Sequence, residues 1–159
     1  MAEDLLGWTE IDTGTCSVAR AVEILGDRWT VLVLREVFNG VRRFGDIQTH
    51  IGVSRSVLAQ RLATLKEQGV LERRPYQEPG DRVRHEYRLT PLGRGLQPVL
   101  VALNNFGDQF LSGPDGPPVL LRHADCGALV SAALVCADDH RVGPREIRLE
   151  LGPGARPRA

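Results

Sequence analysis

Two helix signals separated by a very short connection constrain the fold of this chain more than any other feature. Residues 44–51 carry apolar side chains at helical spacing, and Gly52-Val53 leaves room only for a tight turn. Ser54 is then a good N-cap for a second helix that reaches about residue 68. The apolar stripe of that helix consists of Leu58, Leu62 and Leu65. A short helix, a tight turn and a capped amphipathic helix in this order predict a helix-turn-helix.

Further helix signals precede this unit, and a hairpin follows it. Ser17 and Asp27 are suitable N-caps for helices over 17–26 and about 28–38. After the unit, a strand near 71–76, a Glu-Pro-Gly-Asp turn and an alternating strand that ends at Leu89 predict a hairpin. Such a hairpin forms the wing of a winged helix-turn-helix. The predicted fold class is α+β, mainly helical, with an N-terminal helix and a small β-rich tail.

A long helix is predicted after the wing, because Thr90-Pro91 pairs an N-cap with a proline at the first helical position. Pro98 should bend this helix locally. Its apolar residues are spaced by four and three, which is a heptad seam: Leu92, Leu96, Val99, Leu103, Phe106 and Phe110. The seam could pack within one chain, but its last two residues lie beyond what one small module covers. A homodimer interface is the favoured interpretation.

Composition and the placement of Gly and Pro residues suggest five segments. They are an arm (1–16), the winged helix-turn-helix and dimerisation domain (17–111), a Gly/Pro linker (112–118), a small β unit (119–151) and a disordered tail (152–159). In the β unit, Ile147, Leu149 and Leu151 alternate with charged residues, which predicts a final strand.

The charge pattern is more informative than the net charge, which is zero. Residues 42–88 hold ten Lys/Arg against six Asp/Glu, which is compatible with one basic face on a neutral protein. No apolar run approaches the ~20 residues of a membrane span. The acidic start of the chain lacks a signal-peptide pattern. We therefore expect a soluble protein of the cytoplasm.

The second helix of the predicted helix-turn-helix presents residues suited to reading DNA. With its leucines inward, Ser56 and Gln60 point outward, and a glutamine can bond adenine through two hydrogen bonds. Arginines on a protruding hairpin suit a minor groove or the DNA backbone. The predicted contacts to double-stranded DNA are Arg43, Ser54, Arg55, Ser56, Gln60, Arg61, Arg82 and Arg84. Each feature alone is common on solvated surfaces, but their ordered combination favours DNA binding.

These residues resemble the HxlR family of bacterial winged helix-turn-helix regulators. The matching positions are Cys16 and residues 25–30, 34–36, 40, 43–47, 51–54, 57–62, 65, 69–71, 73, 76, 87–90 and 93. The resemblance spans about 16–111, and the wing is longer than the usual pattern. It implies a transcription regulator that forms homodimers through the first and last helices of the module. A two-fold dimer would read an inverted repeat whose half-sites lie about one helical turn apart.

Cys16 is a candidate redox switch. It directly precedes a predicted helix, a position that favours the reactive thiolate. Some relatives use an N-terminal cysteine to sense oxidants, as the resemblance implies. The alternative is an inert, partly buried cysteine.

A structural zinc site is a second candidate. His123 and Cys126, together with Cys136 and His140, offer four ligands for tetrahedral zinc. The alternative is a small apolar unit in which both cysteines are merely buried.

Other functions were weighed against DNA binding. The chain has no P-loop, GxGxxG after a strand, GxSxG or HExxH motif, so an enzyme is not expected. A winged helix can also serve as a dimerisation or protein-docking module. A regulator controlled by a small-molecule effector in an apolar pocket is a further possibility. A repressor is the default, because a small dimer on a promoter blocks polymerase without an activating surface.

Overall fold

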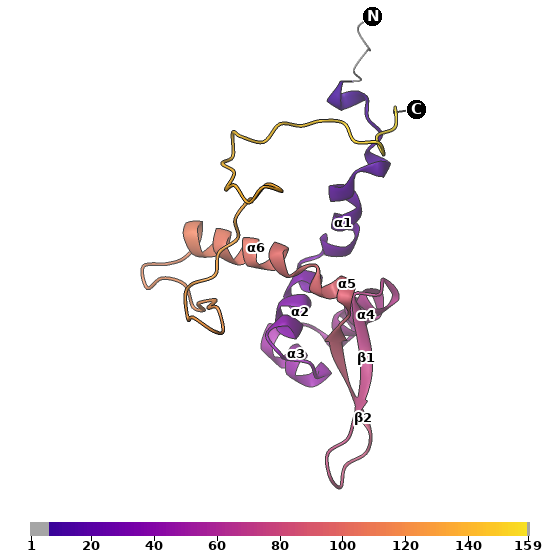
Figure 1. Cartoon of the computed structure of the whole chain (residues 1–159). Helices are drawn as coiled ribbons and strands as arrows, with labels where there is room; N and C mark the ends of the chain where they lie inside the picture. The colour runs from indigo at the N-terminus through magenta and orange to yellow at the C-terminus, as the bar shows by residue number, and fades with distance from the viewer. Residues whose placement is uncertain (1–6, 159) are drawn as a thin grey trace, which may run out of the picture.

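The computed structural model describes residues 7–158, and their fold is α+β and mainly helical, as predicted (Figure 1). Residues 1–6 of the predicted arm and Ala159 lie outside the described residues. The arm contains two short turns of 3-10 helix, Trp8–Glu10 and Thr13–Thr15. The elements that follow are α1 (Ser17–Leu25), α2 (Arg28–Phe38), α3 (Phe44–Ile51), α4 (Arg55–Glu67), β1 (Leu71–Tyr76), β2 (Arg84–Leu89), α5 (Pro91–Arg94) and α6 (Gln97–Phe110).

Local capping fixes the ends of the central helices. The Asp27 carboxylate accepts hydrogen bonds from the backbone N–H of Trp29 and Thr30, at 2.9 and 3.1 Å, and so begins α2. Gly52 ends α3 in the left-handed conformation, with φ 66°, which glycine adopts without strain. Ser54 then caps α4 by accepting from the Val57 N–H. The predicted helix-turn-helix is thereby confirmed.

The core lies between α2, α3, α4 and the start of β1. Its ten buried apolar residues are Val33, Leu34, Val37, Ile47, Val53, Leu58, Leu62, Leu65, Val70 and Leu71. The three predicted leucines of α4 are all at most 1% exposed. Burying one such side chain contributes about 1.5–3 kcal/mol. The stripe of α4 therefore fixes which face of that helix is left for solvent.

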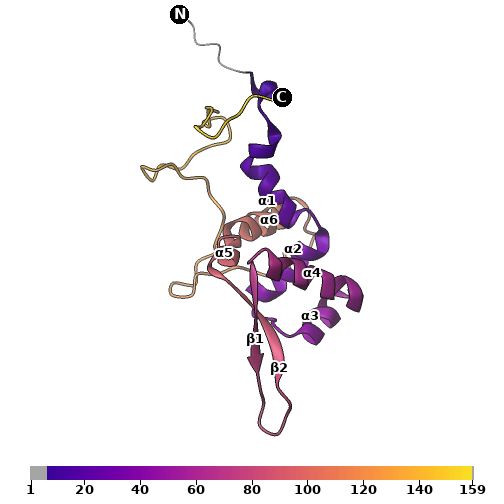
Figure 2. The same cartoon turned by 90° about the vertical axis from the view of Figure 1, so that its right-hand side faces the viewer.

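The wing is joined to the helix-turn-helix by backbone pairing. β1 and β2 run antiparallel in a register from Leu71↔Leu89 to Tyr76↔Arg84. Arg43, just before α3, forms an isolated bridge with Glu86, and the Tyr87 N–H donates to the Arg42 carbonyl at 2.9 Å. The tip of the hairpin projects away from the helices in both views (Figures 1 and 2).

The helix after the wing is broken rather than bent. Thr90 caps α5 as predicted, because its hydroxyl accepts from the Gly93 N–H at 3.1 Å. However, α5 ends at Arg94, and Pro98 lies in the first turn of the separate helix α6. The proline ring excludes a helical carbonyl four residues earlier, at Arg94, but is tolerated at a helix start. The predicted single helix with a bend at Pro98 is therefore wrong.

The tail after α6 differs from the predicted β unit. Between residues 112 and 158, the structure has isolated bridges, such as Arg122↔Leu129 and Val135↔Arg141, and no named strand. The alternating segment at 147–151 has no strand partner there, and an unpaired strand is not stable. The terminal residues were predicted to be disordered, but Pro157 forms a bridge with Ile11 of the arm.

Candidate nucleic-acid interface

The outward face of α4 carries the side chains predicted to read bases. Ser56, Gln60 and Ala63 are exposed, while the leucines between them are buried. Within the described residues, the Gln60 amide makes no intramolecular hydrogen bond, so its donor and acceptor are both free for a partner. The Ser54 hydroxyl lies 3.2 Å from that of Ser56 at the start of the helix. Gln60 can therefore offer hydrogen bonds without first breaking internal ones, whereas the Ser56 hydroxyl already contacts that of Ser54.

The start of α4 is held against α3. Val53, in the turn, is buried, which seats the connection on the core. The Arg55 guanidinium lies over the ring of Phe44, 5.3 Å from its centroid, and the arginine remains exposed. Arg55 is therefore exposed at the start of α4, and its contact with DNA stays a prediction.

Arg43 connects the start of α3 to the wing. Its guanidinium donates to the Glu78 carboxylate at 2.5 Å and lies 4.6 Å from the centroid of the Tyr76 ring. The hydrogen bond to Glu78 raises the pKa of Arg43 above its ordinary value. The side chain is nearly half exposed, so it stays accessible to solvent although it pairs with Glu78.

Arg61 lies away from the reading face. Its Nε is 3.3 Å from the Asp27 carboxylate at the start of α2, and its side chain is 27% exposed. Sequence periodicity placed Arg61 beside Gln60, but the acidic cap of a neighbouring helix attracts it inward. The structure thus favours a positioning role for Arg61 over the predicted DNA contact.

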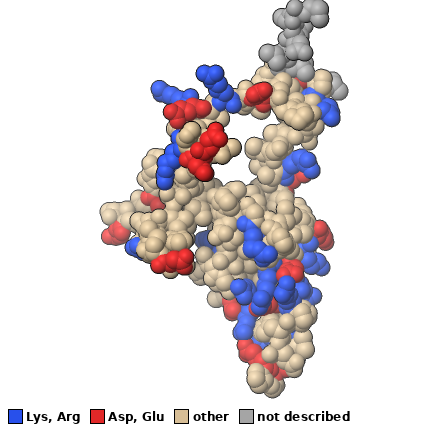
Figure 3. Space-filling view, in the orientation of Figure 1, with Lys and Arg blue, Asp and Glu red and all other residues tan. Residues whose placement is uncertain are grey.

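Arginines of the wing differ in how far they are neutralised. Arg84 pairs with Asp81 at 3.1 Å, and Arg88 pairs with Glu86. Arg82 is exposed near the tip, and none of the carboxylates in residues 7–158 pairs with it. Figure 3 shows Lys and Arg gathered over the base of the hairpin, with acidic side chains nearer its tip. Arg82 is therefore the wing arginine whose charge is most available to DNA.

A buried carboxylate beneath α3 was missed by sequence reasoning. Glu36 is 1% exposed and accepts hydrogen bonds from Arg35 and His50. Burial alone would raise the pKa of Glu36, but the bonds from His50 and Arg35 outweigh it and lower that pKa below its ordinary value. The sequence signal that could have indicated this buried carboxylate is an acidic residue between buried positions of α2, next to Val37.

Most of the heptad seam is exposed on the described chain. Leu92 lies on α5, and Leu96 is half-buried between the two helices. The others lie along α6, where Val99, Leu103, Phe106 and Phe110 are 42–62% exposed. The two phenylalanine rings contact each other, with centroids 5.1 Å apart. The structure thus leaves a continuous apolar stripe without a cover.

The four predicted zinc ligands do not come together. His123 Nδ1 lies 3.2 Å from Cys126 Sγ within one turn, while Cys136 and His140 belong to a second turn. Among residues 7–158, no three His, Cys, Asp or Glu side chains are grouped closely enough to hold a metal ion. Each closely spaced pair lies in a turn of its own, so the four residues do not form the predicted site. Cys126 and Cys136 are exposed, which also contradicts the alternative of two buried cysteines.

Cys16 is half-buried at the N-cap of α1, and it is a free thiol. Its side chain makes no capping hydrogen bond, and Ser17, the predicted cap, is the first helical residue instead. The thiol therefore lies at the junction of the arm and α1.

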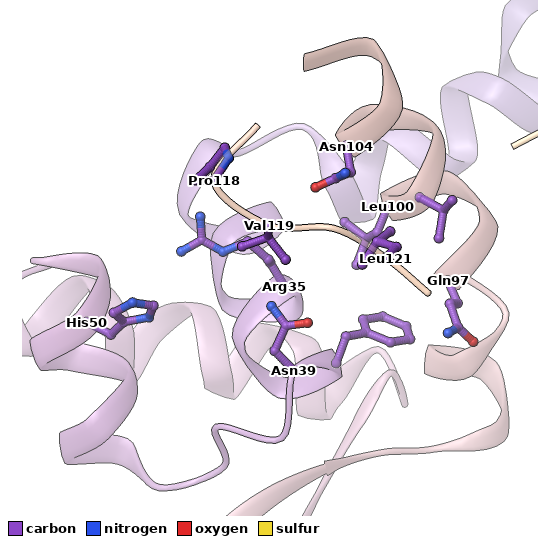
Figure 4. Close-up of a pocket in the computed structure, with 11 residues that line it drawn as sticks. Arg35, Asn39, His50, Gln97, Leu100, Asn104, Pro118, Val119 and Leu121 are labelled. Atoms are coloured by element: carbon purple, nitrogen blue, oxygen red, sulfur yellow. The ribbon is translucent and has the colours of Figure 1, made fainter. Parts of the chain in front are cut away.

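A cavity of about 420 Å³ lies between α2, α6 and the first part of the tail. Phe38, Leu100 and Leu121 form much of its apolar wall, while Arg35 and Asn104 supply polar groups (Figure 4). His50, which bonds Glu36, also borders it. The cavity therefore touches both the helix-turn-helix and the helix that carries the seam.

A capped α4 with a free polar face, followed by a basic wing, defines a winged helix-turn-helix DNA-binding protein. Residues 24–114 match the model of the HxlR-like helix-turn-helix family, and the chain belongs to that family. The resemblance seen in the sequence is thereby confirmed.

Relatives of known sequence are transcription regulators. The chain is 45% identical over 139 residues to an HTH-type transcriptional regulator of Mycobacterium tuberculosis, a match that covers 87% of each protein. It is 40% identical over 97 residues to one from Synechocystis, covering 60% of this chain and 70% of that one. Together with the family, these matches identify a helix-turn-helix transcription regulator that binds DNA, not an enzyme.

Solved structures show the same fold. The crystal structure of PA1607, described as a transcription factor, superposes with a TM-score of 0.75 at 35% identity, covering 85% of this chain and 94% of that one. The reduced form of the transcriptional regulator YodB from B. subtilis gives 0.51 at 31% identity, covering 61% and 94%. No helix within residues 7–158 is long and apolar enough to cross a membrane.

Proposed function

We propose that the chain is a cytoplasmic repressor that binds an inverted repeat in double-stranded DNA as a homodimer and is released by a small-molecule or redox signal. The observation that carries the proposal is the outward face of α4, where Ser56 and Gln60 are exposed above a fully buried stripe. The major groove is ~12 Å wide and admits such a helix. Gln60 reads adenine there, while Arg82 of the wing contacts the minor groove or backbone.

Binding to DNA upstream of the chain's own gene, against scrambled DNA, tests the proposal. We expect specific binding whose affinity falls steeply with salt, because phosphate contacts release counterions. Gln60→Ala should weaken specific binding by about 1–3 kcal/mol and leave binding to scrambled DNA unchanged. Glu67→Ala, an exposed change at the far end of the same helix, is the matched control. Equal, weak binding to both DNAs would instead favour a protein-docking module.

The exposed seam supports the homodimer. An apolar stripe that includes Phe106 and Phe110, each more than half exposed, is typical of a surface that another chain covers. Phe106→Asp should convert the dimer to a folded monomer in analytical ultracentrifugation. Thr49→Asp, which adds the same charge at an exposed position of α3 away from the seam, should do so far less. A dimer that withstands Phe106→Asp would reject the seam as its interface.

The cavity between α2 and α6 supports a small-molecule signal. Its apolar wall and few polar groups are typical of a small-ligand site, and its volume lies within the usual range. A ligand there would touch Asn104 on the dimerisation helix and His50 on the first helix of the helix-turn-helix. Val101→Trp, which fills the cavity, should remove the response to any compound that releases the wild type from DNA.

Cys16 supports the alternative that a redox signal releases the protein from DNA. Its thiol is free and partly accessible at the arm–α1 junction. Diamide should lower DNA affinity of the wild type and not of Cys16→Ser. Loss of binding in both proteins would assign the effect to the exposed Cys126 or Cys136, and unchanged binding in both would reject a redox signal.

A further inference from the structure

The middle of the tail carries exposed apolar side chains but makes no core of its own. Within residues 132–151, Leu134, Val135, Ile147 and Leu149 are 52–70% exposed. The bridge Val135↔Arg141 and scattered turns are the regular pairing here. Exposed apolar side chains on an extended segment are costly to hydrate, so such a segment is normally covered in the functional assembly.

Two anchors hold this segment at its ends. On one side, the Ala132 N–H donates to the side-chain oxygen of Asn105 on α6 at 2.6 Å. On the other side, the Asp12 N–H donates to the Arg156 carbonyl at 2.8 Å, and the Arg158 N–H to the Glu10 carbonyl at 2.7 Å. The arm, α1, α6 and the tail therefore form a closed circuit of chain.

The circuit surrounds an open space rather than a packed interior. In the space-filling view, an opening remains between α1 and the tail (Figure 3), and the ribbon in Figure 1 shows α6 along its lower side. Apolar side chains belong to each of its boundaries. They include Val18 and Val22 on α1, 71% and 52% exposed, and Leu149 on the tail, 70% exposed.

The heptad seam is continuous with this surface. A groove of about 590 Å³ runs between α6 and residues 132–134, and it is lined by Val99, Phe106 and Phe110 of the seam together with Leu134 of the tail. A chain that covers the seam must therefore also contact the tail. This continuity identifies the occupant of the opening as the same partner that covers α6.

The match to a solved relative reaches beyond the winged helix-turn-helix. The match to PA1607 covers 85% of this chain. That share exceeds the part of the chain before residue 112, so the superposition extends into the tail.

We propose that residues 132–151 clasp a second copy of this chain, so that each tail covers the α1–α6 face of its partner and the two chains are intertwined. The inference rests on the homodimer of the proposed function and adds a second contact to its seam. Under two-fold symmetry, each copy gives one tail and receives one. The alternation of Ile147 and Leu149 with Arg148 and Glu150 then places the apolar side on the partner and the charged side in water.

The first test measures the oligomeric state of the full chain. Ile147→Asp/Leu149→Asp should raise the dimer dissociation constant about tenfold or more in sedimentation equilibrium, because it places two charges against apolar helices. Leu120→Asp/Leu129→Asp is the matched control, since these tail leucines are 52% and 62% exposed but lie outside the clasp. It should leave the constant within about twofold. Circular dichroism of all variants checks that the monomer fold is retained.

The outcomes separate the clasp from the homodimer itself. A wild-type protein that is monomeric at every concentration would overturn both proposals. If Phe106→Asp breaks the dimer but Ile147→Asp/Leu149→Asp does not weaken it, the seam is retained as the dimer interface and the clasp is overturned. A dimer weakened by both, with the control unchanged, supports the clasp.

Cross-linking distinguishes an exchanged tail from one that folds back on its own chain. In a background of Cys16→Ser, Cys126→Ser and Cys136→Ser, Val22→Cys and Leu149→Cys are carried on two co-expressed chains of different size. A flexible bismaleimide should join the two sizes, and it should do so much less when Leu129→Cys replaces Leu149→Cys. If a single chain that carries both cysteines cross-links only within itself, the clasp is overturned.

Discussion

The Glu36 carboxylate lies 2.6 Å from Nδ1 of His50, and the carboxylate is buried while the imidazole is 67% exposed. The contact joins the last turn of α2 to the last turn of α3, at the edge of the cavity. Because the second oxygen of the carboxylate accepts from Arg35, the buried charge is hydrogen-bonded on both sides. A buried carboxylate in this state fixes how the helix-turn-helix sits on α2.

The pKa of Glu36 predicts an acid-sensitive contribution to stability. Its folded-state pKa is below the ordinary value of 4.5, so its contribution is fully present above that value. It is lost as pH falls through the lower folded pKa. Urea unfolding of the wild type between pH 3 and 7 should show this loss, and Glu36→Gln should reduce it. A variant with the same pH dependence as the wild type would contradict the assignment.

Replacement of Glu36 should also destabilise the protein at neutral pH. Glu36→Gln removes the charge that strengthens three hydrogen bonds, two from Arg35 and one from His50, and we expect a loss of about 1–3 kcal/mol in the free energy of unfolding. Glu78→Gln is the matched control, because Glu78 also pairs with an arginine, Arg43, but is exposed on the wing. Its effect should stay within about 0.5 kcal/mol.

Gly93 is predicted to tolerate no side chain. A Cβ at this position would lie 2.3 Å from the backbone oxygen of Val70, so the backbone would have to shift. Gly93→Ala should therefore cost about 1–3 kcal/mol of folding free energy. Gly45→Ala, at a helical position with nothing within 4 Å of the added atom, should be neutral or stabilising by about 0.5–1 kcal/mol. Equal effects of the two changes in thermal unfolding would show that the close approach is not present.

Arg82 and Arg61 should differ in the salt dependence of DNA binding. Arg82→Ala should lower the slope of log affinity against log salt by about 0.9, since one phosphate contact is lost. Arg61→Ala should leave the slope unchanged and cost at most about 1 kcal/mol of stability, through its partly exposed pair with Asp27. Arg145→Ala in the exposed tail is the control for a general loss of charge. If Arg61→Ala also lowers the slope of log affinity against log salt, Arg61 contacts DNA after all.

Local signals in the sequence determined most of the fold. Asp27, Gly52 and Ser54 act within a few residues of themselves, so the limits of α2, α3 and α4 were predicted to within about one residue. The break before α6 was missed because Pro98 is compatible with both a kink and a helix start. The tail was missed because alternation predicts a strand only where a neighbouring strand exists to pair with it.

The site was predicted less completely than the fold. The exposure of Ser56 and Gln60 follows from the periodicity of one helix, and sequence alone shows it. The pairs of Glu36 with His50 and of Arg61 with Asp27 depend on angles between helices, which periodicity does not contain. The four zinc candidates were over-predicted from the sequence. The short spacing within each pair suggested that the two pairs would meet, but the path of the tail keeps them apart.

The backbone bonds that tie the wing to the start of α3 have a consequence for the operator. Because Tyr87 and Glu86 pair with Arg42 and Arg43, the base of the hairpin is held at the start of α3, the helix that precedes α4. If Gln60 reads bases and Arg82 reaches the neighbouring DNA as proposed, this link sets the offset between the two contacts. Inserting one base pair between these two positions within a half-site would rotate them by about a tenth of a turn, a change that only distortion of the DNA could absorb.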